Sequence, residues 1–201
     1  MTITPATRTY FRSILWIFAL MLLANPAGAQ VINEFVIGHT GTDRHEYMEL
    51  SGAPGQSYAN LSFVILDGSV NPGQVLYVVT AGTTDANGIW WSGYLGTSVI
   101  ETSDRSTSIL LVDGFTGATG NDLDSNNDGT LDSRPWASLL DDVAVNNQHS
   151  GIPAVNNLYS ATVLREFDPA WDNQSYGPGG ASRVPNATDT NAVSDWVRND
   201  W

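Results

Sequence analysis

The chain alternates between short apolar runs and segments rich in turn-forming residues. The apolar runs are five to eight residues long and contain many Val, Ile, Leu, Tyr and Trp residues, whereas Gly, Asn, Asp and Ser dominate between them. This alternation is typical of β-strands joined by turns. The predicted strands are VINEFVI (31–37), HEYMELS (45–51), LSFVILD (61–67), QVLYVVT (74–80), IWWSGYL (89–95), TSILLVDG (107–114), DDVAV (141–145) and TVLREF (162–167).

No long segment shows the spacing of an amphipathic helix. One or two helical turns are expected between Asn191 and Arg198, with Thr190 or Asn191 as the cap. The longest polar connections are 67–74 and 113–141. Many short strands at this spacing predict an all-β fold, a sandwich or a barrel.

The N-terminus has the three parts of a secretory signal peptide. Arg8 and Arg12 precede an apolar run from Ile14 to Ala24, and Ala27-Gly28-Ala29 offers a cleavage site between small residues. A spanning helix needs about 20 apolar residues, so the run is short for a retained anchor. We expect residues 1–29 to be removed, which would leave Gln30–Trp201 as one domain of 172 residues in the periplasm or outside the cell, with no further membrane span.

The amino-acid composition limits which classes of molecule the protein could bind. The mature chain would carry six arginines, no lysine and all 21 acidic residues, a net charge of −15. Such a charge repels phosphate backbones and argues against direct nucleic-acid binding. There is no cysteine, so a secreted domain of this size must be held by its core or by a metal ion.

Several stretches resemble the lamin tail domain family in a consistent order. They are VINEF, EYMELSG, LSFVILDG and STSILLVDGFTG, followed by SRVPNATDTNAVSDW (182–196) near the C-terminus. The resemblance implies an immunoglobulin-like β-sandwich and no fixed catalytic residues. It also implies a context, since bacterial lamin-tail-like domains are often fused to secreted nucleases or phosphoesterases. The given residues before Val31 contain no coiled-coil rod, and residues 120–136 differ from the lamin version, so no filament role is expected.

The stretch DLDSNNDGTLD (122–132) is a candidate calcium loop. In a register that starts at Asp124, the side chains of Asp124, Asn126, Asp128 and Asp132 occupy positions 1, 3, 5 and 9. Thr130 would offer its carbonyl at position 7. Gly129 occupies position 6, where the chain turns sharply, and Leu131 can face the core.

The pattern is incomplete at position 12. A full EF-hand has a bidentate Glu there, and this chain has Pro135. Asp122, Asp141 or Asp142 could supply the missing carboxylate. The loop is closer to the DxDxDGxxD loops of extracellular calcium repeats, and the alternative is a polar turn without an ion. A bound calcium ion would be structural.

Candidate catalytic residues are few. The three histidines, His39, His45 and His149, lack the i, i+4 spacing of a metal or catalytic motif. In an extended strand His45, Tyr47 and Glu49 share one face, opposite Glu46, Met48 and Leu50, so no local triad forms. Glu34 and Glu49 could meet across two strands as a catalytic pair, but two solvated or salt-bridged carboxylates are the more common arrangement. The sequence therefore predicts no enzyme.

The aromatic residues suggest a binding surface. Adjacent Trp90 and Trp91 must point to opposite faces of a strand, so one of them should approach solvent. The interpretation that fits these observations is a secreted, non-catalytic binding or structural module with an extracellular protein or polysaccharide as partner. The alternatives are an accessory domain for a secreted nuclease or phosphoesterase, and a carbohydrate-binding domain. The last would need a row of coplanar exposed aromatic rings.

Overall fold

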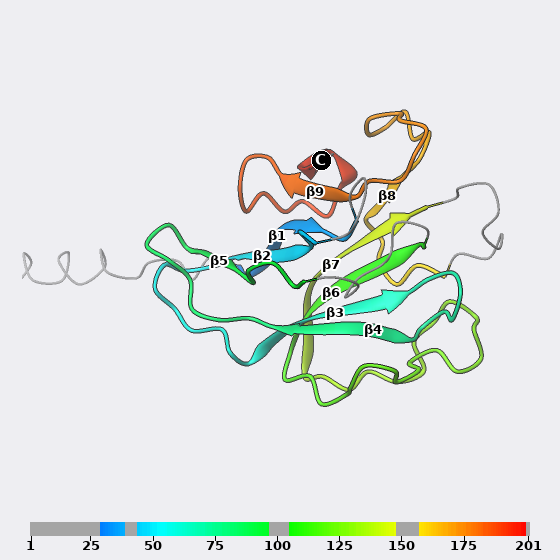
Figure 1. Cartoon of the computed structure of the whole chain (residues 1–201), viewed down its shortest axis with the longest axis horizontal. Coiled ribbons are helices and arrows are strands. Elements are labelled where there is room, and N and C mark those ends of the chain that lie inside the picture. Colours follow the sequence, from blue (N-terminus) through cyan, green and yellow to red (C-terminus); the bar gives the residue numbers. More distant parts are fainter. Residues whose placement is uncertain (1–28, 39–43, 97–104, 148–156, 200–201) are drawn as a thin grey trace, which may run out of the picture.

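The computed structural model describes residues 29–38, 44–96, 105–147 and 157–199, and in them two five-stranded sheets form a β-sandwich (Figure 1). The strand order is β10-β9-β1-β2-β5 in the first sheet and β4-β3-β6-β7-β8 in the second. All pairs are antiparallel except β7 with β8. The strands are β1 (Val31–Val36), β2 (Tyr47–Ser51), β3 (Leu61–Asp67), β4 (Val75–Thr80), β5 (Ile89–Trp91), β6 (Thr107–Asp113), β7 (Ser138–Asn146), β8 (Val163–Arg165), β9 (Gly180–Arg183) and β10 (Trp196–Arg198).

The all-β sandwich is confirmed, and each of the eight predicted segments contains a strand, although only Ile89–Trp91 of 89–95 is a strand and β7 begins earlier than predicted, at Ser138. The sequence pattern did not mark β9 and β10, because GASR and WVR are short and carry no long apolar run. The helical turn is present as a 3-10 turn, Val193–Asp195. The predicted cap, Thr190 or Asn191, was wrong, because the residue that precedes the turn is Ala192. The Thr190 hydroxyl donates to Asp195 instead.

The main core fills the space between the sheets. Alternate residues of each strand point inward, as the period of two requires. Trp90 joins this core and stacks on Phe63, with 6.0 Å between ring centroids. The fully buried members include Ile32, Phe35, Met48, Leu50, Phe63, Ile65, Ile109, Leu111 and Val143.

A second apolar cluster lies on the outer face of the β4-β3-β6-β7-β8 sheet. Leu66 and Leu110 project there, and the long connection between β6 and β7 covers them through Leu123, Leu131 and Trp136. In Figure 1 this connection runs below β3 and β4, on the side away from β1 and β2. It was predicted as a polar connection, but its apolar side chains make it a second layer that buries β3 on both faces.

The C-terminal segment is held by a buried arginine. The Arg183 guanidinium donates through Nη2 to both carboxylate oxygens of Asp141, at 3.0 and 2.9 Å, and its Nε donates to the Ile32 carbonyl at 2.8 Å. It also lies 4.4 Å from the ring centroid of Trp196 and within 3.5 Å of Asp195. These contacts tie β1, β7 and β9 together, so the SRVP…SDW stretch has a structural role.

The described ranges contain no helix long and apolar enough to cross a membrane. The apolar run from Ile14 to Ala24 lies outside them.

Candidate functional site

The acidic loop is anchored to the start of β4. The backbone N–H of Val75 donates to Asn121 O at 2.8 Å, and that of Leu123 donates to Gly73 O at 3.0 Å. Leu123 is buried, and its carbonyl accepts from the backbone N–H of Asp132 at 2.8 Å, which closes the loop. Gly73 has a φ of 84°, and a Cβ there would lie 2.6 Å from Asp124 Cβ. Only glycine permits this close approach.

Asp124 is the centre of the loop and has no exposed surface. Its Oδ1 accepts from the backbone N–H of Asp128 at 3.2 Å, and its Oδ2 accepts from that of Gly129 at 2.9 Å. The Tyr159 hydroxyl donates to Oδ2 at 2.7 Å, and the Asn157 amide reaches the same atom at 3.5 Å. A buried carboxylate needs such donors, so Asp124 joins the loop to the irregular segment 157–160 that precedes β8.

The other predicted ligands lie on the exposed side of the loop. Asn126 Oδ1 accepts from the backbone N–H of Asp128 at 3.0 Å, and Asp128 Oδ1 accepts from that of Thr130 at 2.8 Å. Asp132 instead accepts from the Ser125 backbone N–H and hydroxyl, at 2.9 and 2.8 Å. The structure therefore brings Asp124, Asn126 and Asp128 together on one turn and places Asp132 against Ser125. The turn itself depends on positive φ angles at residues 127 and 129.

In the part of the chain that the structure describes, no three His, Cys, Asp or Glu side chains form a group that could hold a metal ion. Asp141 is committed to Arg183 and does not supply the missing carboxylate, and Asp142 lines the neighbouring hollow instead. Asp128 and Asp132 are exposed, however, and their side chains can rotate. The oxygens available to an ion are Asp124 Oδ1, Asn126 Oδ1, the Asp128 and Asp132 carboxylates and the Thr130 carbonyl.

Beside the loop is an open hollow of about 620 Å³ on the outer face of β6 and β7. Leu110 and Leu139 contribute from these strands, Leu131 and Trp136 from the long connection, and Tyr159 from the segment before β8. Gly129 and the predicted ligand Thr130 also line it, so the acidic loop forms one wall. Tyr159 is shared, because its hydroxyl is bound to Asp124 while its side chain lines the hollow.

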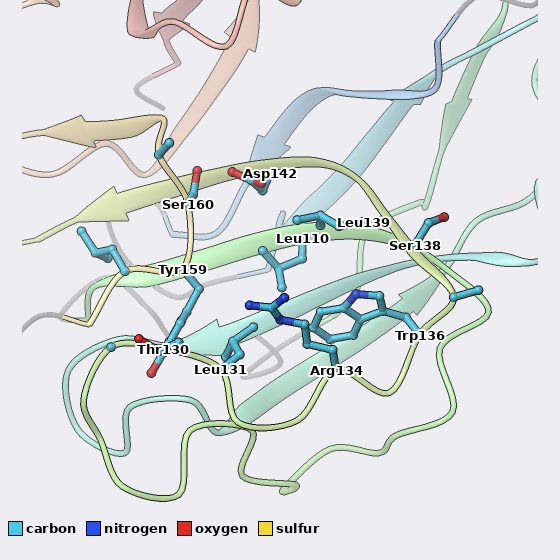
Figure 2. Close-up of a pocket in the computed structure, with 14 residues that line it drawn as sticks. Leu110, Thr130, Leu131, Arg134, Trp136, Ser138, Leu139, Asp142, Tyr159 and Ser160 are labelled. Carbon is cyan, nitrogen blue, oxygen red and sulfur yellow. The ribbon is translucent and has the colours of Figure 1, made fainter.

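The polar groups of the hollow have opposite charges. Figure 2 shows the Arg134 side chain folded in between Leu131 and Trp136, with Asp142 and Ser160 along the opposite rim. Burial raises the pKa of the Asp142 carboxyl, which the Ser160 hydrogen bond partly offsets. Trp136 is stacked against Phe115, with 6.4 Å between ring centroids, which fixes its orientation. The hollow thus offers a cation, an acceptor and an apolar floor, and none of the described residues that line it is a histidine.

The sequence did not indicate Tyr159, Asn157 or Arg134 as site residues. Tyr159 lies 35 positions from Asp124, so no local spacing could show that they meet. Arg134 follows the acidic loop directly, and an arginine so close to a candidate acidic site was the one available signal.

The carboxylates and tryptophans of the first sheet lie as predicted. Glu34 is directly opposite Glu49 in the β1–β2 register. Trp90 faces the core, whereas 49% of Trp91 is exposed. His45 contacts the Tyr94 ring edge-on at 4.8 Å, while His39 and His149 lie outside the described residues.

No protein-family model, no curated protein and no solved structure matches this chain.

Proposed function

We propose that the protein is a non-catalytic binding module that acts outside the cytoplasm and takes its ligand in the hollow beside the acidic loop. The observation that carries this proposal is the position of Arg134. Its guanidinium lies in the hollow, and no carboxylate of the described residues pairs with it. In a chain with 21 acidic residues and eight arginines, an arginine without an ion pair is available for a ligand.

The shape of the hollow supports binding. Protein sites for ligands are concave, mostly apolar and equipped with a few polar groups that fix orientation. Trp136, Leu131 and Leu139 provide the apolar surface, and Arg134 and Asp142 provide a donor and an acceptor at opposite sides. An extracellular protein segment or a polysaccharide is the proposed ligand. The immunoglobulin-like, lamin-tail-like assignment and export through a signal peptide belong to the same proposal.

The carbohydrate-binding alternative predicted a row of coplanar exposed aromatic rings. On the first sheet the exposed rings meet edge to face, Trp91 with Tyr94 at 89° and Tyr47 with Trp91 at 76°. Rings at right angles cannot stack on successive sugars of one chain. A saccharide, if it binds, therefore belongs in the hollow, where Trp136 is the tryptophan that could face it.

Calcium enters this proposal as a structural ion in the 122–132 loop. The sequence register and the positive φ angles that curl the loop support it. The ion would neutralise Asp124, Asp128 and Asp132 and would fix the wall of the hollow formed by Gly129 and Thr130. The accessory role beside a secreted nuclease or phosphoesterase is the alternative, with the partner bound in trans.

The test is nuclear magnetic resonance titration of the ¹⁵N-labelled protein with methyl glycosides and with acetylated, amidated tripeptides. We expect the shifts to cluster at Leu131, Trp136 and Tyr159, and Arg134→Ala to weaken the binding. Arg165→Ala is the matched control, because it removes an exposed arginine on β8 that does not line the hollow. Binding that maps elsewhere, or that Arg134→Ala leaves intact, would contradict the proposal.

A further inference from the structure

The outer face of the first sheet carries a row of side chains that crosses all five strands. The register places Glu34 opposite Ser182 and Glu49, Val197 opposite Ser182, and Trp91 opposite Glu49. Two carboxylates therefore lie side by side in the middle of the sheet. An aromatic edge formed by β2, β5 and the residues that follow β5 adjoins them.

Three aromatic rings form that edge. Tyr94 lies 5.3 Å from Trp91 and 6.3 Å from Tyr47 between ring centroids, and Tyr47 lies 6.2 Å from Trp91. Tyr94 is 59% exposed and Trp91 49%. Because the rings are nearly perpendicular, they present faces and edges in several directions, and a ring face carries the negative part of its quadrupole. Exposed faces of this kind attract cations.

Each of the two carboxylates accepts hydrogen bonds from neutral donors of its own. The Asn33 amide donates to Glu49 Oε1 at 2.6 Å, the Asn199 amide donates to Glu34 Oε1 at 2.8 Å, and the Tyr47 hydroxyl also donates to Glu34 Oε1. Hydrogen bonds from described residues reach Oε1 of each carboxylate, which leaves both Oε2 atoms for a ligand. Burial, together with the charge of Glu34, raises the pKa of Glu49 although the Asn33 bond opposes it. Like charges opposite each other destabilise a strand pair, and a cation would relieve this.

We propose that this face, formed by Glu34, Glu49, Tyr47, Trp91 and Tyr94, docks an arginine-bearing segment of a partner protein. A guanidinium is planar, donates through a fork that suits carboxylates, and stacks on aromatic rings. It matches the two open Oε2 atoms and the exposed rings at once. Lysine supplies the charge without the planar fork, so arginine is the favoured side chain. The surface belongs to the first sheet and the hollow to the second, so the two are independent; Figure 1 shows the two sheets.

The test is titration of the ¹⁵N-labelled protein with three acetylated, amidated peptides: Gly-Arg-Gly-Arg-Gly, its lysine counterpart and its citrulline counterpart. We expect the arginine peptide to shift the Trp91 indole N–H and the backbone signals of Glu34, Glu49 and Tyr94. The lysine peptide should bind more weakly, and the citrulline peptide, which has the shape without the charge, should not bind. Equal binding of the citrulline peptide would overturn the proposal.

Single substitutions on the first sheet test where the arginine peptide binds. Glu49→Gln should weaken this binding about tenfold, the effect of one charge-assisted contact, and Trp91→Ala about two- to fivefold. The matched controls are Glu166→Gln and Phe167→Ala just after β8, where Phe167 is 64% exposed, and both should leave the affinity unchanged. Because the protein is acidic overall, an arginine peptide could also gather at the 122–132 loop. Shifts confined to that loop, or equal losses in the controls, would refute docking on the first sheet while leaving the hollow untouched.

Discussion

The hydrogen bond between Tyr159 and Asp124 should stabilise both the acidic loop and the wall of the hollow. Tyr159→Phe removes only the hydroxyl that donates to Asp124 Oδ2 at 2.7 Å. A hydrogen bond to a charged group contributes about 1.5–3 kcal/mol. For a domain of this size 1 kcal/mol corresponds to about 2–4 °C in Tm, so we expect Tm to fall by about 3–12 °C. Asp124→Asn should cost more, because its amide cannot accept from both Asp128 and Gly129 N–H groups.

The assay is thermal and urea unfolding followed by circular dichroism, with and without calcium. The double variant closes a thermodynamic cycle, and we expect a coupling free energy of about 1–2 kcal/mol between Tyr159 and Asp124. Tyr94→Phe is the matched control, since this exposed tyrosine lies on the other sheet and should change stability by less than about 0.5 kcal/mol. Tyr159→Phe should lower Tm and leave any calcium response in place, whereas Asp124→Asn should remove that response too. A Tyr159→Phe variant as stable as the parent, or strictly additive effects, would refute the role given to this bond.

Four further outcomes are expected. Calcium at 10 mM should stabilise the protein by about 1.4–2.7 kcal/mol if the dissociation constant is about 10⁻⁴–10⁻³ M, and magnesium should stabilise it less. Asp128→Ala should abolish the calcium-dependent shift in Tm, and Asp85→Ala should preserve it. A parent protein whose Tm does not respond to calcium would leave the loop a polar turn. Arg183→Leu should lower the free energy of unfolding, measured in urea, by about 3–5 kcal/mol, because Asp141 would stay buried without its cation. Adding Asp141→Asn to the same chain should recover part of that loss, and a loss that is not recovered would point to an unrelated packing defect. N-terminal sequencing of the exported protein should begin at Gln30, and a mass that retains the first 29 residues would count against export with cleavage. Purified protein should hydrolyse neither DNA nor phosphoesters, with or without divalent metal, and turnover above the blank would overturn the non-catalytic assignment.

The strands could be predicted from sequence because their signal is local. LSFVILD was expected at 61–67, and β3 has these bounds. The alternation that separates Trp90 from Trp91 is likewise a property of any extended strand. The role of the 113–141 connection could not be predicted from its local sequence. Its few apolar residues cover the outer face of β3 and β6, and that face exists only once the sheet has formed.

The site depends mostly on contacts between distant residues. The acidic loop was visible from its spacing, but the partner that buries Asp124 comes from residue 159. The Arg183 and Asp141 pair joins residues 42 positions apart, and this explains why the C-terminal stretch looked like a motif without revealing what it does. The stretch supplies a buried cation surrounded by carboxylates, which holds strands together.

The two proposed surfaces use the two outer faces of the sandwich in different ways. The outer face of the second sheet is covered by the β6–β7 connection, so its ligand must enter a hollow at the margin of that layer. The outer face of the first sheet, from Glu34 to Trp91, holds half-buried and exposed side chains in strand register. Packed sheets lie about 10 Å apart, and the space between the two faces is filled mainly by the apolar core, with the Arg183–Asp141 ion pair as a polar link between the sheets. Arg134→Ala and Glu49→Gln should therefore act on separate ligands, and either surface can fail its test without affecting the other.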